Sequence, residues 1–328
     1  MKYRNGEKDL SKEDRKFRRI YQKARVGYYA NAVARRLIGK NLTEPKFQRA
    51  VLMAQEGNDR LYEAVLSGKP FAATRFGGTE TKTIADVLYT KAGGKCGGVS
   101  DRTLTRIMQL SGFFPADREA LNRFVELYME CCADIDLLGI WNILLQSYLA
   151  DECTVNAKLA ELRMFEPYYF EHPWTRALQG KKVVVIHPFA ETIENQYRKR
   201  QQLFENKEIL PEFELRCVKA VQTLAGNRCE HETWFDALEW MYEETMKEEF
   251  DVALLGCGAY GLPLAVKLKR AGKQAVHVGG SLQLFFGIKG GRWDNHEVIG
   301  KLYNEYWVRP SEAETIQKSD AVEGGCYW

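Results

Sequence analysis

Three glycines spaced as Gly-x-Gly-x-x-Gly, at Gly256, Gly258 and Gly261, form the most chemically informative pattern in this sequence. They follow the apolar run 252–255 and precede an amphipathic segment and a second apolar run, 275–278. This order predicts a strand, a tight turn, a helix and a parallel strand. Glycines at such a turn, together with the N–H groups of the helix start, favour an anion such as a phosphate. A tight helix–strand junction without a ligand is the alternative.

The pattern lacks one feature of a dinucleotide site, an acid about 20 residues past the turn that holds the ribose hydroxyls. Glycines and a serine stand there instead. The turn therefore indicates a nucleotide-linked ligand without indicating NAD. We expect the ligand to contact residues of the turn and of the segment after the second strand, namely Gly256, Gly258, Tyr260, Gly261, Gly279, Gly280 and Ser281.

A second group of candidate residues lies at the end of a strand predicted over residues 71–76. Arg75 belongs to this strand, and Gly77, Gly78, Thr79 and Glu80 follow it. The planar guanidinium of an arginine pairs well with phosphate, and the two glycines clear space beside it. Glu80 is a candidate for holding a ribose hydroxyl, a sugar hydroxyl or a metal ion. Its alternative role is that of a first-turn acid favoured by the helix dipole.

A third group follows the β-branched run 182–186, which is typical of a buried parallel strand. His187 comes next and is a candidate base or phosphate ligand. Glu194, on the polar helix that follows, is a candidate for deprotonating a hydroxyl nucleophile. For this helix, a merely solvated polar face is the alternative.

Two cations and an indole lie close together in the glycine-rich segment 286–293, as Lys289, Arg292 and Trp293. Their spacing suits a mobile loop that closes over a diphosphate and a flat base. A plain surface loop is the alternative.

Strands that alternate with helices predict an α/β fold with a Rossmann-like, mainly parallel sheet flanked by helices. We expect an N-terminal helical region over residues 1–68, with a second helix over 46–66, and a Rossmann-like domain over 69–328. Within that domain, residues of about 101–165 are predicted to be a helical insertion, and the aromatic tail 297–328 is predicted to pack on the body. Since parallel strands share one carboxyl edge, positions 77, 187, 256 and 279 should converge on a pocket for pyrophosphate.

Composition limits the class of protein. The 328 residues carry a net charge of +3, too small to favour a nucleic-acid surface. No apolar stretch is long enough to cross a bilayer, and the first residues have no apolar core of a secretory signal. Eight cysteines without a C-x-x-C pair are expected to be free thiols in the cytoplasm, with no structural metal.

Basic residues crowd the first predicted helix, among them Lys16, Arg19 and Lys23. A solvated face is the first interpretation of such a pattern. Attraction to an acidic membrane surface or to a partner is the alternative, and it would place the protein at the inner face of the cell membrane.

Taken together, the motifs resemble the GT-D type glycosyltransferases, bacterial enzymes of surface-glycan and glycoprotein assembly. The resemblance rests on the Arg-Phe-Gly-x-x-Glu motif of residues 75–80 and on the strand–glycine–helix unit of residues 251–280. The chain also looks like proteins encoded in bacterial polysaccharide-biosynthesis loci. The strings that carry this second likeness are GCGAYGLPLA (256–265), GGSLQLFFGIKGGRW (279–293), NEYWVRP (304–310) and EGGCYW (323–328).

The resemblance implies a nucleotide-sugar donor such as a UDP-hexose, a lipid-linked or protein-linked glycan acceptor, and a divalent cation, Mg²⁺ or Mn²⁺. In that family an Asp-x-Glu element inside the first motif serves the metal and the diphosphate. The matching triplet here is Gly78-Thr79-Glu80, so Glu80 is the remaining metal ligand. One carboxylate holds such a cation weakly unless substrate phosphates complete its shell. Arg75, Lys289 and Arg292 are then expected to neutralise the diphosphate.

Two other classes of function stay open. A NAD(P)- or S-adenosylmethionine-dependent enzyme would use the same glycine turn, and a strand-end acid would have favoured it. A non-catalytic nucleotide-sugar-binding or scaffold protein of a glycan assembly complex is favoured by the missing Asp.

Overall fold

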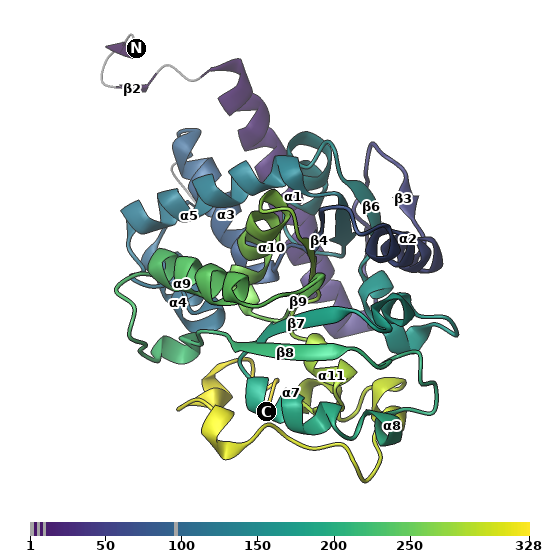
Figure 1. The fold of residues 1–328 in the computed structure, drawn as a ribbon. Coiled ribbons are helices and arrows are strands. Elements are labelled where there is room, and N and C mark those ends of the chain that lie inside the picture. Colours follow the sequence, from purple (N-terminus) through teal and green to yellow (C-terminus); the bar gives the residue numbers. More distant parts are fainter. Residues whose placement is uncertain (1–2, 5–6, 9–10, 95–97) are drawn as a thin grey trace.

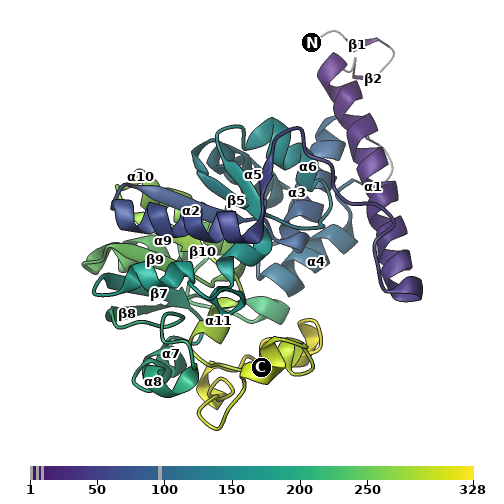
Figure 2. The ribbon, with the colours of Figure 1, turned by 90° about the vertical axis from the view of Figure 1, so that its right-hand side faces the viewer.

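The protein is built on one eight-stranded parallel sheet. The computed structural model describes the backbone of residues 3–4 and 7–8 and all of residues 11–94 and 98–328. The strand order is β3-β6-β5-β4-β10-β9-β7-β8, and every neighbouring pair runs parallel. Helices cover both faces of this sheet (Figures 1 and 2), which confirms the predicted α/β class.

The strands of the sheet are short. They are β3 (Val51–Leu52), β4 (Phe71–Arg75), β5 (Leu137–Ile140), β6 (Lys158–Glu161), β7 (Lys182–His187), β8 (Glu214–Lys219), β9 (Val252–Leu255) and β10 (Gln274–His277). Two further strands, β1 (Tyr3–Arg4) and β2 (Glu7–Lys8), pair with each other antiparallel.

The helices differ widely in length. They are α1 (Lys12–Ile38), α2 (Ala54–Ser67), α3 (Gly78–Lys91), α4 (Asp101–Ser111), α5 (Arg118–Cys131), α6 (Gln146–Tyr148), α7 (Ala190–Tyr197), α8 (Arg200–Leu203), α9 (Trp234–Lys247), α10 (Gly261–Arg270) and α11 (Leu282–Phe285). Within the described ranges, none has both the length and the apolar composition that crossing a bilayer requires.

Alternation along the strands divides the interior into two cores. In β7, Val184 and Ile186 pack with α3, α4, α5, α9 and α10, whereas Val183 and Val185 face the opposite side of the sheet. On that side they pack with α2, α7, α11 and the C-terminal tail. A strand buried on both faces needs a continuous apolar run, which is why β7 was recognisable from its sequence.

Helix α1 lies outside these layers, along the edge of the body (Figure 2). Ser11 caps it through a bond from the Asp14 N–H to Oγ, and Gly39 ends it in the left-handed conformation. Its inner face buries Phe17 and Tyr21 against Tyr89 of α3 and its neighbours.

Two predictions about secondary structure are wrong. Residues 101–165 are not wholly helical, because β5 and β6 lie inside this range and belong to the sheet. The helix predicted over 46–66 begins only at Ala54, since Val51 and Leu52 pair with β6 as an edge strand. The boundary placed at residue 68 stays a prediction, although β3 on its N-terminal side is part of the sheet.

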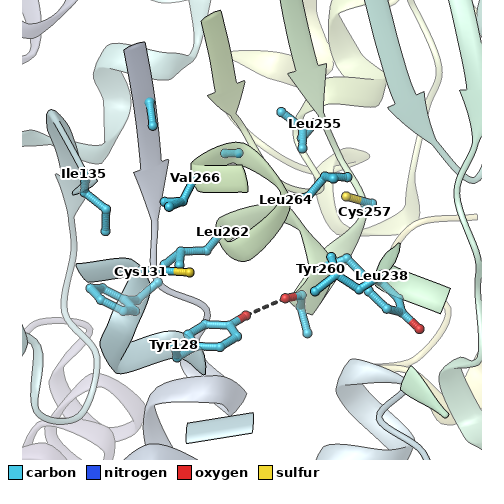
Figure 3. Close-up of a cluster of buried hydrophobic side chains, with 14 of the residues drawn as sticks. Tyr128, Cys131, Ile135, Leu238, Leu255, Cys257, Tyr260, Leu262, Leu264 and Val266 are labelled. Carbon is cyan, nitrogen blue, oxygen red and sulfur yellow. Dashed lines mark hydrogen bonds between the residues drawn. The ribbon is translucent and has the colours of Figure 1, made fainter. Parts of the chain in front are cut away.

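Helix α10 packs over the middle of the sheet, and the 3-10 turn that leads into it, Gly258–Tyr260, is held by a tyrosine of α5 (Figure 3). The hydroxyl of Tyr128 in α5 donates to the carbonyl of Ala259, with 2.5 Å between the oxygens. On the other side of this turn, Gly261 meets the buried ring of His277, at the end of β10. A Cβ at Gly261 would lie 2.8 Å from Cγ of that ring and closer still to other ring atoms.

We therefore expect Gly261→Ala to lower the free energy of unfolding by about 1–3 kcal/mol, because the His277 ring, 3.0 Å from Thr74 Oγ1, would have to move. Gly27→Ala in α1 is the matched control. A Cβ there meets only Thr43 Oγ1, at 4.0 Å, so alanine should be neutral or stabilise by about 0.5–1 kcal/mol. Urea unfolding of both variants measures the difference, and equal effects would contradict this account.

Candidate functional site

A cavity of about 90 Å³ opens at the carboxyl ends of β4, β7, β9 and β10. Six residues predicted for the ligand site line it, namely Arg75, His187, Gly256, Gly258, Tyr260 and Gly280. The other lining residues are Leu110, Ser111, Pro188, Phe189, Val221, Gln222, Thr223, Leu224, Cys257, Gln283 and Tyr327. A volume of this size suits a phosphoryl group, so the rest of any larger ligand would extend beyond the cavity.

Arg75 brings the one positive charge among the described residues that line the cavity. It is the last residue of β4, and its guanidinium lies against Gly279, whose φ is +83°. A Cβ at Gly279 would come within 2.7 Å of Arg75 Nε, so only glycine leaves this path open. The Trp141 ring centroid lies 5.7 Å from the guanidinium carbon. No described carboxylate forms an ion pair with Arg75, which leaves its charge available to an anion.

His187 is a neutral donor in this structure. Its ring is buried, and Nδ1 accepts the Phe189 backbone N–H at 3.0 Å. Burial lowers the pKa of His187 to about 3, so near neutral pH the ring carries a single proton, on Nε2. Gly256 lets the ring approach, since a Cβ there would lie 3.1 Å from Nε2. This arrangement speaks against the predicted role as a base, because the nitrogen that could accept a proton is Nδ1, which the backbone occupies.

The glycine turn supplies backbone donors. Gly258 has φ +58°, and its N–H finds no backbone acceptor among the described residues. Tyr260, whose ring stacks on Trp234 with 4.7 Å between centroids, fixes the end of the turn. Strand β10 ends at His277, and Val278 and Gly279 follow it, so this strand end offers no carboxylate for a ribose.

Glu80 does not line the cavity; it lies behind Ser111, which does. Ser111 Oγ donates to Glu80 Oε1 at 2.7 Å, and both side chains are buried. The carboxylate folds back over Gly77, where a Cβ would lie 2.6 Å from the Glu80 carboxyl carbon. Sequence reasoning missed Ser111, because it belongs to α4, whose helical pattern gave no sign that its last turn would reach the sheet edge.

The residues at this edge do not fit a divalent cation. A Cβ at Gly78, the position at which the family that the sequence resembles has its Asp, would point at Ile143 and Trp141, each at 3.6 Å. One oxygen of Glu80 is already bonded to Ser111. Across the described ranges, no three His, Cys, Asp or Glu side chains are grouped to hold a metal ion. Mg²⁺ and Mn²⁺ prefer several oxygen ligands, which this set does not supply.

Several predicted residues do not line the cavity. Glu194 is exposed on α7, and Gly77, Gly78 and Thr79 form the start of α3. The remaining members of this set are Gly261, Gly279, Ser281, Lys289, Arg292 and Trp293, none of which lines the cavity.

The segment 286–293 is tied down by hydrogen bonds instead of standing open as a loop. The Lys289 N–H donates to Val308 at 2.7 Å, and the Gly291 N–H donates to Trp328 at 3.0 Å. Arg292 is paired with Glu323, and Trp293 is buried. The predicted mobile loop is therefore a packed corner.

The C-terminal tail contributes Tyr327, which sequence reasoning did not place at the site. A Cβ at Gly280 would lie 3.2 Å from the Tyr327 hydroxyl. Gln283 donates to the Tyr327 carbonyl at 3.0 Å and so fixes the tail beside the cavity. Nearby, Glu314 accepts the Glu191 and Thr192 N–H groups at the start of α7. That helix start is therefore occupied by a carboxylate of the protein itself.

The seven cysteines that the structure describes are free; Cys96 lies outside the described residues. Burial raises the pKa of Cys257, the one that lines the cavity, to about 12. A thiol of that kind stays protonated near neutral pH and is not a nucleophile.

No family model and no curated protein matches the chain. One solved structure that resembles it is described as "The highly conserved domain of unknown function 1792 has a distinct glycosyltransferase fold". The two share 11% sequence identity and superpose with a TM-score of 0.44, over 81% of this chain and 93% of that one.

Glu166, just beyond β6, gives the fold a pH dependence. Burial raises its pKa from 4.5 to about 7, against the opposing effects of Tyr168 and of the Arg163 and Arg75 charges. The folded protein thus holds this proton more tightly than the unfolded chain. Its stabilising contribution is complete below the unfolded pKa and is lost as pH rises through about 7.

We expect Glu166→Gln to raise the melting temperature relative to the wild type at about pH 8, by about 2 °C or more. The amide removes the cost of burying a charge, so the gain should disappear at about pH 4, where the wild-type carboxyl is already protonated. Thermal unfolding across this range measures the difference. A constant difference at all pH values would mean that Glu166 acts through packing alone.

Proposed function

We propose that the protein is a cytoplasmic glycosyltransferase that takes a sugar from a nucleotide-sugar donor, with a UDP-hexose as the best candidate. The acceptor would be a lipid-linked or protein-linked glycan in surface polysaccharide or glycoprotein biosynthesis. The observation that carries the proposal is the guanidinium of Arg75, which has no ion-pair partner among the described residues and lies in a cavity at four strand ends. The sequence resemblance of residues 75–80 and 251–293 supports the same assignment.

The diphosphate of the donor would bind among groups that donate hydrogen bonds. Arg75 offers a charged fork, His187 offers Nε2–H, and Gly258 offers a backbone N–H. None of the described lining residues is an Asp or a Glu, so nothing in the cavity wall repels an anion. Donors of this kind stabilise the charge that develops on a departing diphosphate.

Transfer breaks the bond between the anomeric carbon and the phosphate oxygen, and the bonding electrons leave with the diphosphate. A new bond forms between that carbon and the hydroxyl oxygen of the acceptor. The acceptor's proton would pass to Ser111 Oγ, while Ser111 passes its own proton to Glu80 Oε1, 2.7 Å away. In this proposal Ser111 contacts the substrate, and Glu80 is a positioning residue that takes the proton through it.

A second candidate function is binding of the nucleotide sugar without catalysis. The observation that favours it is the lack of any carboxylate among the described residues of the cavity wall. His187 does not replace one, because its free ring nitrogen already carries a proton.

We expect Arg75→Ala to weaken binding of UDP and of UDP-hexoses by about 10- to 100-fold, because a charge-assisted contact is lost. Arg292→Ala is the matched control. Arg292 is paired with Glu323 and does not line the cavity, so its loss should change affinity by less than about twofold. Isothermal titration calorimetry without added metal and with Mn²⁺ measures both. Equal losses in the two variants would contradict the placement of the diphosphate.

The variant Glu80→Gln distinguishes the two candidate functions, a transferase and a protein that binds the nucleotide sugar without catalysis. Glutamine keeps an acceptor for Ser111 but cannot take a proton, so we expect turnover to fall by about 100-fold or more. Affinity for UDP should change by less than about twofold, because Glu80 lies behind the cavity wall. Release of UDP from a panel of UDP-hexoses, with a matching melting temperature as the control for folding, gives the answer. Tight binding without turnover in the wild type would favour the second candidate.

A further inference from the structure

Helix α1 has an outward face that the body of the protein leaves uncovered. Its inner face buries Phe17, Tyr21, Asn31 and Ala34. On the other side, Val26, Tyr29, Val33 and Leu37 follow one another at intervals of three, four and four residues, which places them in one stripe. Their exposed fractions are 71%, 52%, 58% and 77%. Such a row of exposed apolar side chains is unusual for a helix that faces only water.

The same helix concentrates the positive charge of the chain. Residues 12–38 contain nine basic and two acidic side chains, a net charge of +7. The whole chain has a net charge of +3, so the remainder is net −4. Both acids, Glu13 and Asp14, lie in the first turn of the helix.

Three of the basic side chains beside the apolar stripe have no ion-pair partner among the residues that the structure describes. Arg19, Lys23 and Arg36 are exposed, and none of them forms an ion pair with a residue that the structure describes. In an α-helix, position 19 falls on the same side as Leu37, and positions 23 and 36 fall to either side of the stripe. The face therefore combines an apolar centre with cationic margins.

The position of α1 leaves this face accessible. Figure 2 shows the helix along one edge of the molecule, and Figure 1 shows one of its ends projecting beyond the other helices. Its 27 residues span about 40 Å. After Gly39, Asn31 binds the Leu42 and Thr43 N–H groups and holds Leu42, which is 63% exposed, next to the end of the helix.

We propose that the outward face of α1 docks the protein flat on an anionic lipid membrane. The stripe Val26–Tyr29–Val33–Leu37 would enter the boundary between headgroups and acyl chains, while the arginines and lysines at its margins contact lipid phosphates. This is the composition by which interfacial helices bind bilayers. The docking is independent of the proposed transferase activity, because it uses no residue of the cavity.

The charge and the apolar centre of this face favour an anionic bilayer over two other partners, a second copy of the chain and a nucleic acid. In a symmetric pair of copies, two helices of net charge +7 would face each other, which disfavours a dimer through this face. A nucleic acid would match the cations but not the apolar centre of the face. An anionic bilayer matches both.

The test uses the full chain and flotation with two kinds of vesicle, one of phosphatidylcholine alone and one with roughly a third of phosphatidylglycerol. We expect flotation only with the anionic vesicles, and weaker flotation as salt is raised. Val33→Asp/Leu37→Asp and Arg19→Glu/Lys23→Glu should each weaken binding by about tenfold or more. Leu66→Asp, at a 52% exposed leucine on α2, is the matched control and should change binding by less than about twofold.

Three results would overturn the proposal. The first is no binding to anionic vesicles by a wild-type chain that unfolds cooperatively. The second is equal binding to neutral and anionic vesicles, or an equal loss with Leu66→Asp. The third is a dimer in light scattering that Val33→Asp/Leu37→Asp dissociates while vesicle binding is absent, which would assign the face to a second copy.

Discussion

The edge of the sheet depends on a steric constraint, the absence of a Cβ at four glycines. Gly256 admits the ring of His187, Gly261 admits that of His277, Gly279 admits the Arg75 guanidinium and Gly280 admits Tyr327. Each of these side chains comes from a different part of the chain. The glycines therefore seat the protein's own polar and aromatic groups at this edge of the sheet. Among the glycines that line the cavity, only Gly258, where an added Cβ would meet no atom within 4 Å, keeps a backbone open to a ligand.

Where an anion can bind at the same edge depends on which helix N-termini already have a carboxylate of the protein beside them. The N–H groups at the start of α7 are bonded to Glu314, and the first turn of α3 carries Glu80. Both starts already have an acid of the protein beside their partial positive charge. The turn before α10 has no acid of this kind, and Arg75, which forms no ion pair with a residue that the structure describes, lies on the same cavity. An incoming anion is thereby directed to one place among several that look equivalent in the sequence.

The features that could be predicted from the sequence are those that a short local pattern of residues determines. The runs in β7 and β9 are apolar and bounded by turns, so their strands and the parallel arrangement were recognisable. β5 was not, because Leu137–Ile140 is a short apolar run after a helix, and periodicity does not distinguish such a run from more helix. Ser111 and Tyr327 reach the cavity through contacts with residues far away in the chain, Glu80 and Gly280. No local pattern encodes such contacts, whereas Arg75 and His187 follow directly from their places at strand ends.

The two sides of the cavity differ in how many amino-acid substitutions they can tolerate. On one side the glycine corner tolerates few substitutions, since almost any added atom would strike a neighbour. On the other side Val221, Gln222 and Leu224, in the segment after β8, are only partly buried. Selection for a different ligand would therefore act most easily on that second wall, while the contacts made by Arg75 and the glycine turn stay unchanged.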